Sequence, residues 1–255
     1  MLHILRTKIG LTGRRNLIRS LIAACLLSGS ILHSTKSSAQ ETVEMNMPDH
    51  DDKPYYFGIT IGVNLARFQT ELHQRFLTYD SVYIAEPVNS GGLTLGLSAT
   101  GRLSNRFQVR FNPQLMFIER GIYYKLKYAD INGDTVVTKK VESVMMTFPF
   151  QIKFQSDRIG NFRVYTFAGF KFDLDMASNA RAKKAEELVK IQSYDFGPEF
   201  GIGFNFFFPS FIFSPEIKIS NGLRNVHARD ENLKFSNVFD KIQSRMLVFT
   251  IHLEG

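Results

Sequence analysis

The feature that most restricts the fold is a regular alternation of large apolar residues with polar or small ones, which recurs in eight segments after residue 55. The clearest segment places Phe107, Val109 and Phe111 on one face, and Gln108 and Arg110 lie on the other. A period of two is typical of β-strands, in which successive side chains point to opposite faces. The alternating segments lie at 57–65, 93–100, 107–117, 144–154, 162–173, 194–206, 211–219 and 246–253.

The two faces of these segments differ in size as well as in polarity. The apolar face is rich in phenylalanine, of which the chain has 24, whereas the opposite face mixes charges with glycines such as Gly201 and Gly203. An eight-stranded barrel has an interior only just wide enough for side chains to fill, so the bulky face has to point outward, into lipid. Residues 55–255 are therefore predicted to form an all-β fold, an eight-stranded antiparallel transmembrane up-and-down β-barrel. The alternative is a soluble sandwich or lipocalin-like barrel with its apolar face inward.

The connections between the segments alternate in length. Short connections lie at 103–106, 156–161 and 208–210, and long ones lie at 67–91, 119–143, 174–191 and 220–242. The connection at 119–143 is expected to be a hairpin extension that turns at Asn132-Gly133-Asp134. Short periplasmic turns and long extracellular loops are typical of outer-membrane barrels, and an even strand number leaves both termini in the periplasm. A sandwich provides no reason for this alternation.

Residues 1–39 have the layout of a secretory signal peptide. They hold six basic residues and no acidic one, with an apolar core at 21–27 and small residues up to Ala39. Removing six of the 31 basic residues leaves 25 against 24 acidic ones, so the formal charge of +7 does not indicate nucleic-acid binding. Cys25 is the only cysteine and would be lost with the signal peptide, or acylated if the segment were a lipoprotein signal instead. The polar, acidic stretch at 40–54 predicts a disordered periplasmic leader.

Charged residues on the predicted inward face are the first candidates for a functional site. A buried charge needs a partner, so we expect these residues to pair with one another and plug the narrow lumen rather than line an ion path. The set consists of Arg110, Lys153, Lys171, Asp173, Glu199, Glu216 and Lys218.

Motifs for catalysis or for binding a cofactor or metal are weak in this chain. His252 and Glu216 could be drawn as a dyad, but we expect a rim histidine with a local hydrogen bond. No serine lies in a recognisable nucleophile motif, and His50-Asp51-Asp52 is read as solvated charge. Gly201-Ile202-Gly203 lacks the following helix of a dinucleotide fingerprint. We therefore predict that the protein is not an enzyme and uses no cofactor or metal.

The C-terminal part contains the run Pro215–Asn225, the pair Ser244-Arg245 and a last strand that ends in His252-Leu253-Glu254. Together with the runs Phe57–Asn64 and Phe111–Leu115, it resembles the PorT/SprT-like outer-membrane proteins of the Bacteroidota, components of the type IX secretion system. The resemblance implies an accessory outer-membrane barrel that assists protein secretion and, in gliding species, motility. It implies partners among outer-membrane or periplasmic secretion-system proteins, besides outer-membrane lipid, and no nucleic acid.

The long loops at 174–191 and 220–242 and the leader are the expected partner surfaces, because loops on a rigid scaffold commonly carry function. Within them and beside them, Arg224, Asn225 and Arg245 are the candidate contacts. The main alternative is a structural or adhesive small barrel that stabilises the envelope or binds an external ligand. A lipid-modifying enzyme is the third possibility.

Overall fold

The computed structural model of the protein describes residues 44–74, 76, 82–129, 133–177, 191–228 and 235–255. The signal peptide predicted at 1–39 lies outside these residues. Among the residues described, no helix has the length and apolar character needed to span a membrane.

The described residues form ten strands, preceded by one short 3-10 helix, η1 (Pro48–Asp52). The strands are β1 (Tyr55–Leu72), β2 (Val82–Val88), β3 (Ser90–Arg102), β4 (Phe107–Phe111), β5 (Gln114–Leu126), β6 (Val136–Gln155), β7 (Phe162–Asp175), β8 (Tyr194–Phe207), β9 (Ile212–Asn221) and β10 (Phe239–Glu254).

The number of strands differs from the prediction of eight. The third predicted segment is divided into β4 and β5 at Asn112 and Pro113, since proline has no N–H to donate to a strand ladder. The additional strand β2 lies in the stretch predicted as a loop at 67–91 and is separated from β3 by Asn89 alone.

All strand pairings are antiparallel, and the sheet closes on itself. β1 pairs with β10 from Gly58 to Leu72 and, along its other edge, with β3 from Tyr55 to Ala66. The other pairs follow the chain around the ring: β3 with β4 and β5, both of these with β6, then β6–β7, β7–β8, β8–β9 and β9–β10. Closure leaves the backbone of the ring with hydrogen-bonding partners on both sides.

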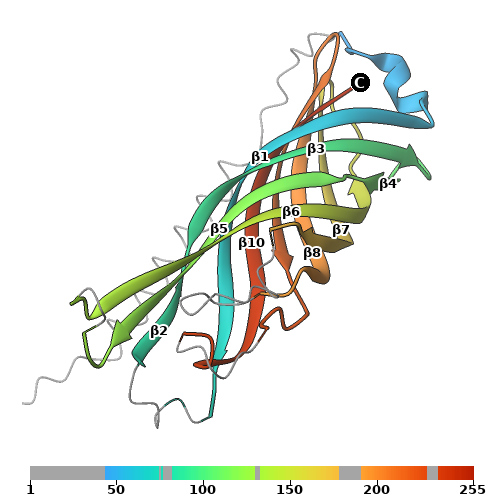
Figure 1. The fold of residues 1–255 in the computed structure, drawn as a ribbon. Helices are drawn as coiled ribbons and strands as arrows, with labels where there is room; N and C mark the ends of the chain where they lie inside the picture. The colour runs from blue at the N-terminus through green and yellow to red at the C-terminus, as the bar shows by residue number, and fades with distance from the viewer. Residues whose placement is uncertain (1–43, 75, 77–81, 130–132, 178–190, 229–234) are drawn as a thin grey trace, which may run out of the picture. The chain divides into compact units, whose positions relative to one another are not determined.

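The connections define two ends of the ring. The short turns at 103–106, 156–161 and 208–211 lie at the end that we call the turn end, where Gly255 N–H also donates to the carbonyl of Phe57. At the opposite, loop end, β5 and β6 stay paired through Lys125 and Val136, and β2 joins them (Figure 1). This confirms the predicted hairpin extension, in which Gly133 has a φ of 83°. That left-handed backbone favours glycine because it has no Cβ.

The inward and outward faces are those that the alternation predicts. Phe57, Ile61 and Leu97 are about half exposed or more, at 62%, 51% and 63%, whereas Thr60 and Asn64 are buried. The apolar face therefore covers the outside of the ring and the polar face lines its interior.

The interior contains two clusters of charged side chains, described below, and two apolar clusters. Charged and amide side chains fill the part near the turn end, and methionine and aliphatic side chains come next: Ala66, Met116, Ile118, Met145, Met246 and Val248. At the loop end an aromatic and aliphatic cluster closes the interior, including Phe68, Ile122, Tyr124, Phe235 and Phe239. The sequence pattern did not predict this apolar cluster, because many of its members lie in stretches read as loops.

Candidate functional site

The charged cluster nearer the turn end is built around an ion pair that spans the interior of the ring, between β4 and β9. Arg110 on β4 donates to Glu216 on β9, with 2.5 Å between nitrogen and oxygen, and neither side chain is exposed. The guanidinium also donates to Gln151 on β6 over 2.5 Å. Tyr165 on β7 donates its hydroxyl to the same Glu216 oxygen over 3.0 Å. Four strands are thus connected through one carboxylate and one guanidinium.

Three more of the predicted residues join this network. Lys218 lies 3.4 Å from Glu199, which also accepts a hydrogen bond from Gln151. Lys153 places its ammonium 4.1 Å from the centre of the Tyr165 ring, a cation–π contact. The structure thus brings five of the predicted charges together inside the ring, but among the described residues the Lys153 ammonium has no hydrogen-bond partner.

Lys171 and Asp173 belong to a second cluster nearer the loop end, where they form an ion pair with each other. Arg120 of β5 lies 3.7 Å from Asp175 and donates to the hydroxyl of Ser143 over 2.7 Å. Sequence reasoning missed Arg120 and Asp175, since both were assigned to connecting loops. Arg120 has the same even-numbered phase as Arg110, so extending the alternation through β5 would have found it.

His252 differs in position from the rim residue that we expected. Its ring nitrogens lie 2.8 Å from the Thr60 hydroxyl and 3.5 Å from the Glu216 carboxylate, and the side chain is fully buried. The hydroxyl, imidazole and carboxylate resemble the composition of a catalytic triad, but each is at most 1% exposed. A catalytic group has to reach its substrate, so this arrangement serves packing in the closed ring.

The part of the leader that the structure describes is folded onto the turn end, where we expected disorder. Asp51 of η1 lies 2.9 Å from Arg163, 3.7 Å from Arg158 and 3.8 Å from Arg102. Burial opposes the charged form of Asp51, but the hydrogen bond from Arg163 and the three guanidinium charges lower the pKa of this carboxyl below its usual range. The polar composition of residues 40–54 predicted disorder. The contacts that order the segment could not be predicted, because the arginines that bind Asp51 lie far away in the sequence.

His50 anchors the same segment. Its ring centre lies 4.6 Å from that of Tyr56 and 6.0 Å from that of Phe207, and its side chain is buried. Burial lowers the pKa of His50 to about 4, so the imidazole is neutral at pH 7. Asn46 adds two hydrogen bonds, from its backbone N–H to Asn161 and from its side chain to the carbonyl of Phe207.

The three predicted partner contacts have different roles. Asn225 accepts hydrogen bonds from the backbone N–H groups of His227 and Ile242, so it holds its own loop against β10. Arg224 lies over the Tyr194 ring at 3.8 Å. Arg245 is exposed on β10, where its Nε donates to Asn221 over 3.0 Å. The stretches 178–190 and 229–234 of the predicted partner loops lie outside the described residues.

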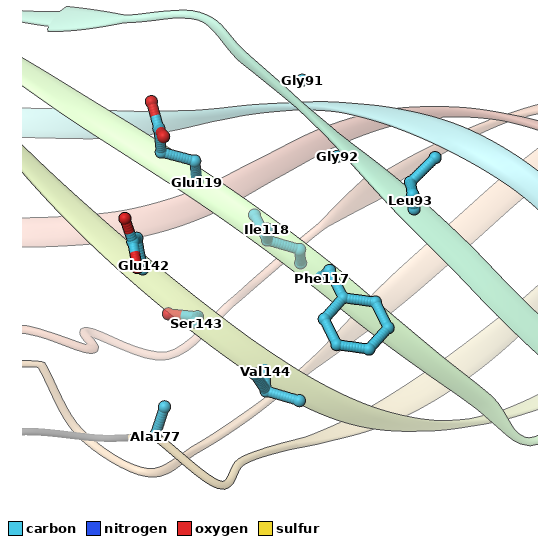
Figure 2. A pocket seen from close by; sticks show the side chains of 10 residues that line it. All are labelled: Gly91, Gly92, Leu93, Phe117, Ile118, Glu119, Glu142, Ser143, Val144 and Ala177. Atoms are coloured by element: carbon cyan, nitrogen blue, oxygen red, sulfur yellow. The ribbon is translucent and has the colours of Figure 1, made fainter.

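A surface pocket of about 380 Å³ lies on the outer side of β3, β5 and β6. Figure 2 shows Glu119 and Glu142 on adjacent strands at one side of it, and Leu93, Phe117 and Val144 at the other. The two glutamates occupy directly opposed positions, and Lys140 lies 2.9 Å from Glu119. Within the described part of the chain, no group of three or more His, Cys, Asp or Glu residues could hold a metal ion.

Comparison with known proteins agrees with the outward apolar face and the closed sheet. Residues 39–228 match the family model described as outer membrane protein beta-barrel domain. No curated protein has a sequence that matches this chain.

Solved structures that are similar to the chain include the following three. OprG from Pseudomonas aeruginosa is 15% identical, with 79% of this chain and 95% of that chain covered and a TM-score of 0.45. Neisserial surface protein A is 11% identical, with 77% and 95% covered and a TM-score of 0.38. Ail of Yersinia pestis is 10% identical, with 80% and 100% covered and a TM-score of 0.35. Because the family match extends over most of its length, the chain belongs to the outer-membrane protein β-barrel domain family, and it is an antiparallel up-and-down barrel of the outer membrane.

Proposed function

We propose that this protein is an accessory component of the type IX secretion machinery, which acts by binding other secretion-system proteins and not as a conduit or an enzyme. In the membrane, its ten strands act as eight crossing passes, with β2 and β3 forming one pass and β4 and β5 another. Short turns face the periplasm in such barrels, so the turn end is periplasmic and the loop end is extracellular.

The filled interior is the observation that carries the non-conducting role. Arg110, Lys153 and Glu216 are buried at the periplasmic end, Met116, Met145 and Met246 follow, and aromatic side chains close the extracellular end. Neither a folded protein nor a hydrated ion fits through such an interior without repacking it. Function is therefore left to the two ends and the outer surface.

The resemblance of the C-terminal run Pro215–Asn225 to the PorT/SprT-like proteins supports the secretion role. The docked leader supports it as well, because η1 presents an ordered periplasmic surface on which a partner can assemble. Because the leader is already ordered, a periplasmic or outer-membrane partner can bind it without a further loss of leader conformational entropy.

A deletion strain complemented with the wild-type chain tests the proposal. We expect cargo proteins to accumulate in the periplasm of the deletion strain and to be secreted again after complementation. A leader variant with Asp51→Ala should secrete less cargo than one with Asp52→Ala, because Asp51, and not Asp52, contacts arginines among the residues that the structure describes. Unchanged secretion in the deletion strain would overturn the proposal.

A structural or adhesive barrel is the second candidate, favoured by the apolar cluster at the extracellular end. Phe68, Tyr124 and Phe239 are fully buried there, where β2, β5 and β6 extend the sheet. Detergent sensitivity of the deletion strain, with normal secretion, would favour this role. Changed acylation of outer-membrane lipid would instead indicate an enzyme, which we do not expect.

A further inference from the structure

The outer face of the β1–β10 pair carries a ladder of opposed residues that changes character at the extracellular boundary of the apolar belt. The successive outward rungs are Leu65–Leu247, Arg67–Arg245, Gln69–Gln243 and Glu71–Lys241. The last rung is complementary, since Lys241 lies 3.2 Å from Glu71. The Arg67–Arg245 rung places two cations directly opposite each other.

Like charges on directly opposed strand positions destabilise a sheet. Both arginines are exposed, and among the residues that the structure describes neither forms an ion pair with a carboxylate. Arg245 is oriented by its hydrogen bond to Asn221, which leaves its terminal nitrogens available. An anion between the two guanidinium groups would remove the repulsion.

The space for such an anion is present. A pocket of about 380 Å³ lies beside this rung. Its lining consists of Arg67, Phe68, Gln69, Thr70, Pro87 and Arg245. Guanidinium groups bind the oxygens of phosphate with paired, charge-assisted hydrogen bonds, and the side-chain amide of Gln69, on the same outer face, can add a further donor.

The position of the pocket identifies the source of the phosphate. Arg67 follows Leu65 by two residues, so the guanidinium pair begins about 7 Å along the strand from the last apolar rung. The two guanidinium groups therefore lie just beyond the apolar belt, where the lipid head groups begin. We propose that Arg67 and Arg245 bind the phosphate of a phosphorylated glycolipid in the outer leaflet. The inference needs only the outer-membrane location, so it stands or falls independently of the secretion role.

Binding of purified lipid A to the mature, full-length protein tests this site. The protein is extracted in detergent, and native mass spectrometry compares lipid A that carries phosphate with the same lipid after enzymatic dephosphorylation. We expect a preference of about tenfold or more for the phosphorylated lipid, because dephosphorylation removes the acceptors of the charge-assisted hydrogen bonds from both guanidinium groups. The preference should disappear in Arg67→Gln/Arg245→Gln and persist in Arg67→Lys/Arg245→Lys.

Arg106→Gln is the matched control, because Arg106 is an exposed arginine at the opposite end of the barrel and pairs with Asp157. It should bind phosphorylated lipid A as the wild type does. If the double variant fails to assemble, Arg67→Gln alone replaces it in the test, because this variant keeps the contact between Arg245 and Asn221. Equal binding of both lipids by the wild type, or an unchanged preference in the double variant, would overturn the proposal. Binding of inorganic phosphate in the pocket without binding of lipid A would also overturn the proposal, since it would indicate that the ligand is a soluble anion.

Discussion

Removing one partner of the buried Arg110–Glu216 pair should destabilise the barrel strongly. Arg110→Met deletes the guanidinium and leaves the carboxylate of Glu216 without exposure to water. Tyr165 still donates to that carboxylate, but a hydroxyl does not replace the lost positive charge. An uncompensated buried charge of this kind costs about 3–5 kcal/mol of unfolding free energy. Glu216→Met should cost a similar amount, because it leaves Arg110 unpaired.

The double variant Arg110→Met/Glu216→Met separates the effect of charge from the effect of packing. Replacing both members of a buried pair with apolar residues of similar volume is often nearly neutral. Gln151 and Tyr165 lose hydrogen-bond partners, so some destabilisation should remain. We expect the double variant to be no less stable than the worse single variant, which makes the two single effects non-additive by about 3 kcal/mol or more.

Urea unfolding in lipid vesicles measures these differences, with the folded fraction read from band migration on unheated gels. Arg106→Met is the control, since the Arg106–Asp157 pair has a similar separation of 3.0 Å but is exposed, at 59% and 81%. It should cost less than about 1 kcal/mol. If Arg110→Met is within about 1 kcal/mol of the wild type, or if the two single effects simply add, the interior pair does not stabilise the barrel as we infer.

Three further predictions concern the leader and the interior. Asp51→Ala should make residues 44–54 more sensitive to protease than Asp52→Ala does, because only Asp51 contacts Arg side chains at the turn end; equal cleavage would contradict the docking. Since burial lowers the pKa of His50 from 6.5 to about 4, docking of the leader should be strongest above pH 6.5 and weaken as the pH falls toward 4. Hydrogen exchange of the leader amides measures this dependence, which His50→Gln should reduce. Gly203→Leu should impair assembly, because a Cβ at Gly203 overlaps the Tyr165 ring, whereas Gly101→Leu faces open space; similar yields of folded protein would argue against this contact.

The sequence was sufficient to predict the class of fold and to assign side chains to the inward and outward faces of the sheet. Alternation around Phe107, Arg110 and Phe111 is a local property of the chain, and the size of the aromatic face determined which side meets lipid. The three short turns were also predictable, since each contains residues that favour turns, such as Ser, Asn, Asp or Pro. Arg120 could also have been predicted, because it continues the inward phase of its strand.

Only the tertiary structure decided which charges pair. Arg110 and Glu216 are 106 positions apart in the chain, and their contact depends on how the strands are staggered around the closed ring. The same holds for Asp51, whose three arginines come from β3, a turn and β7. Alternation determines the face on which a side chain lies, but its partner across the lumen follows from strand register and closure, which no local pattern encodes.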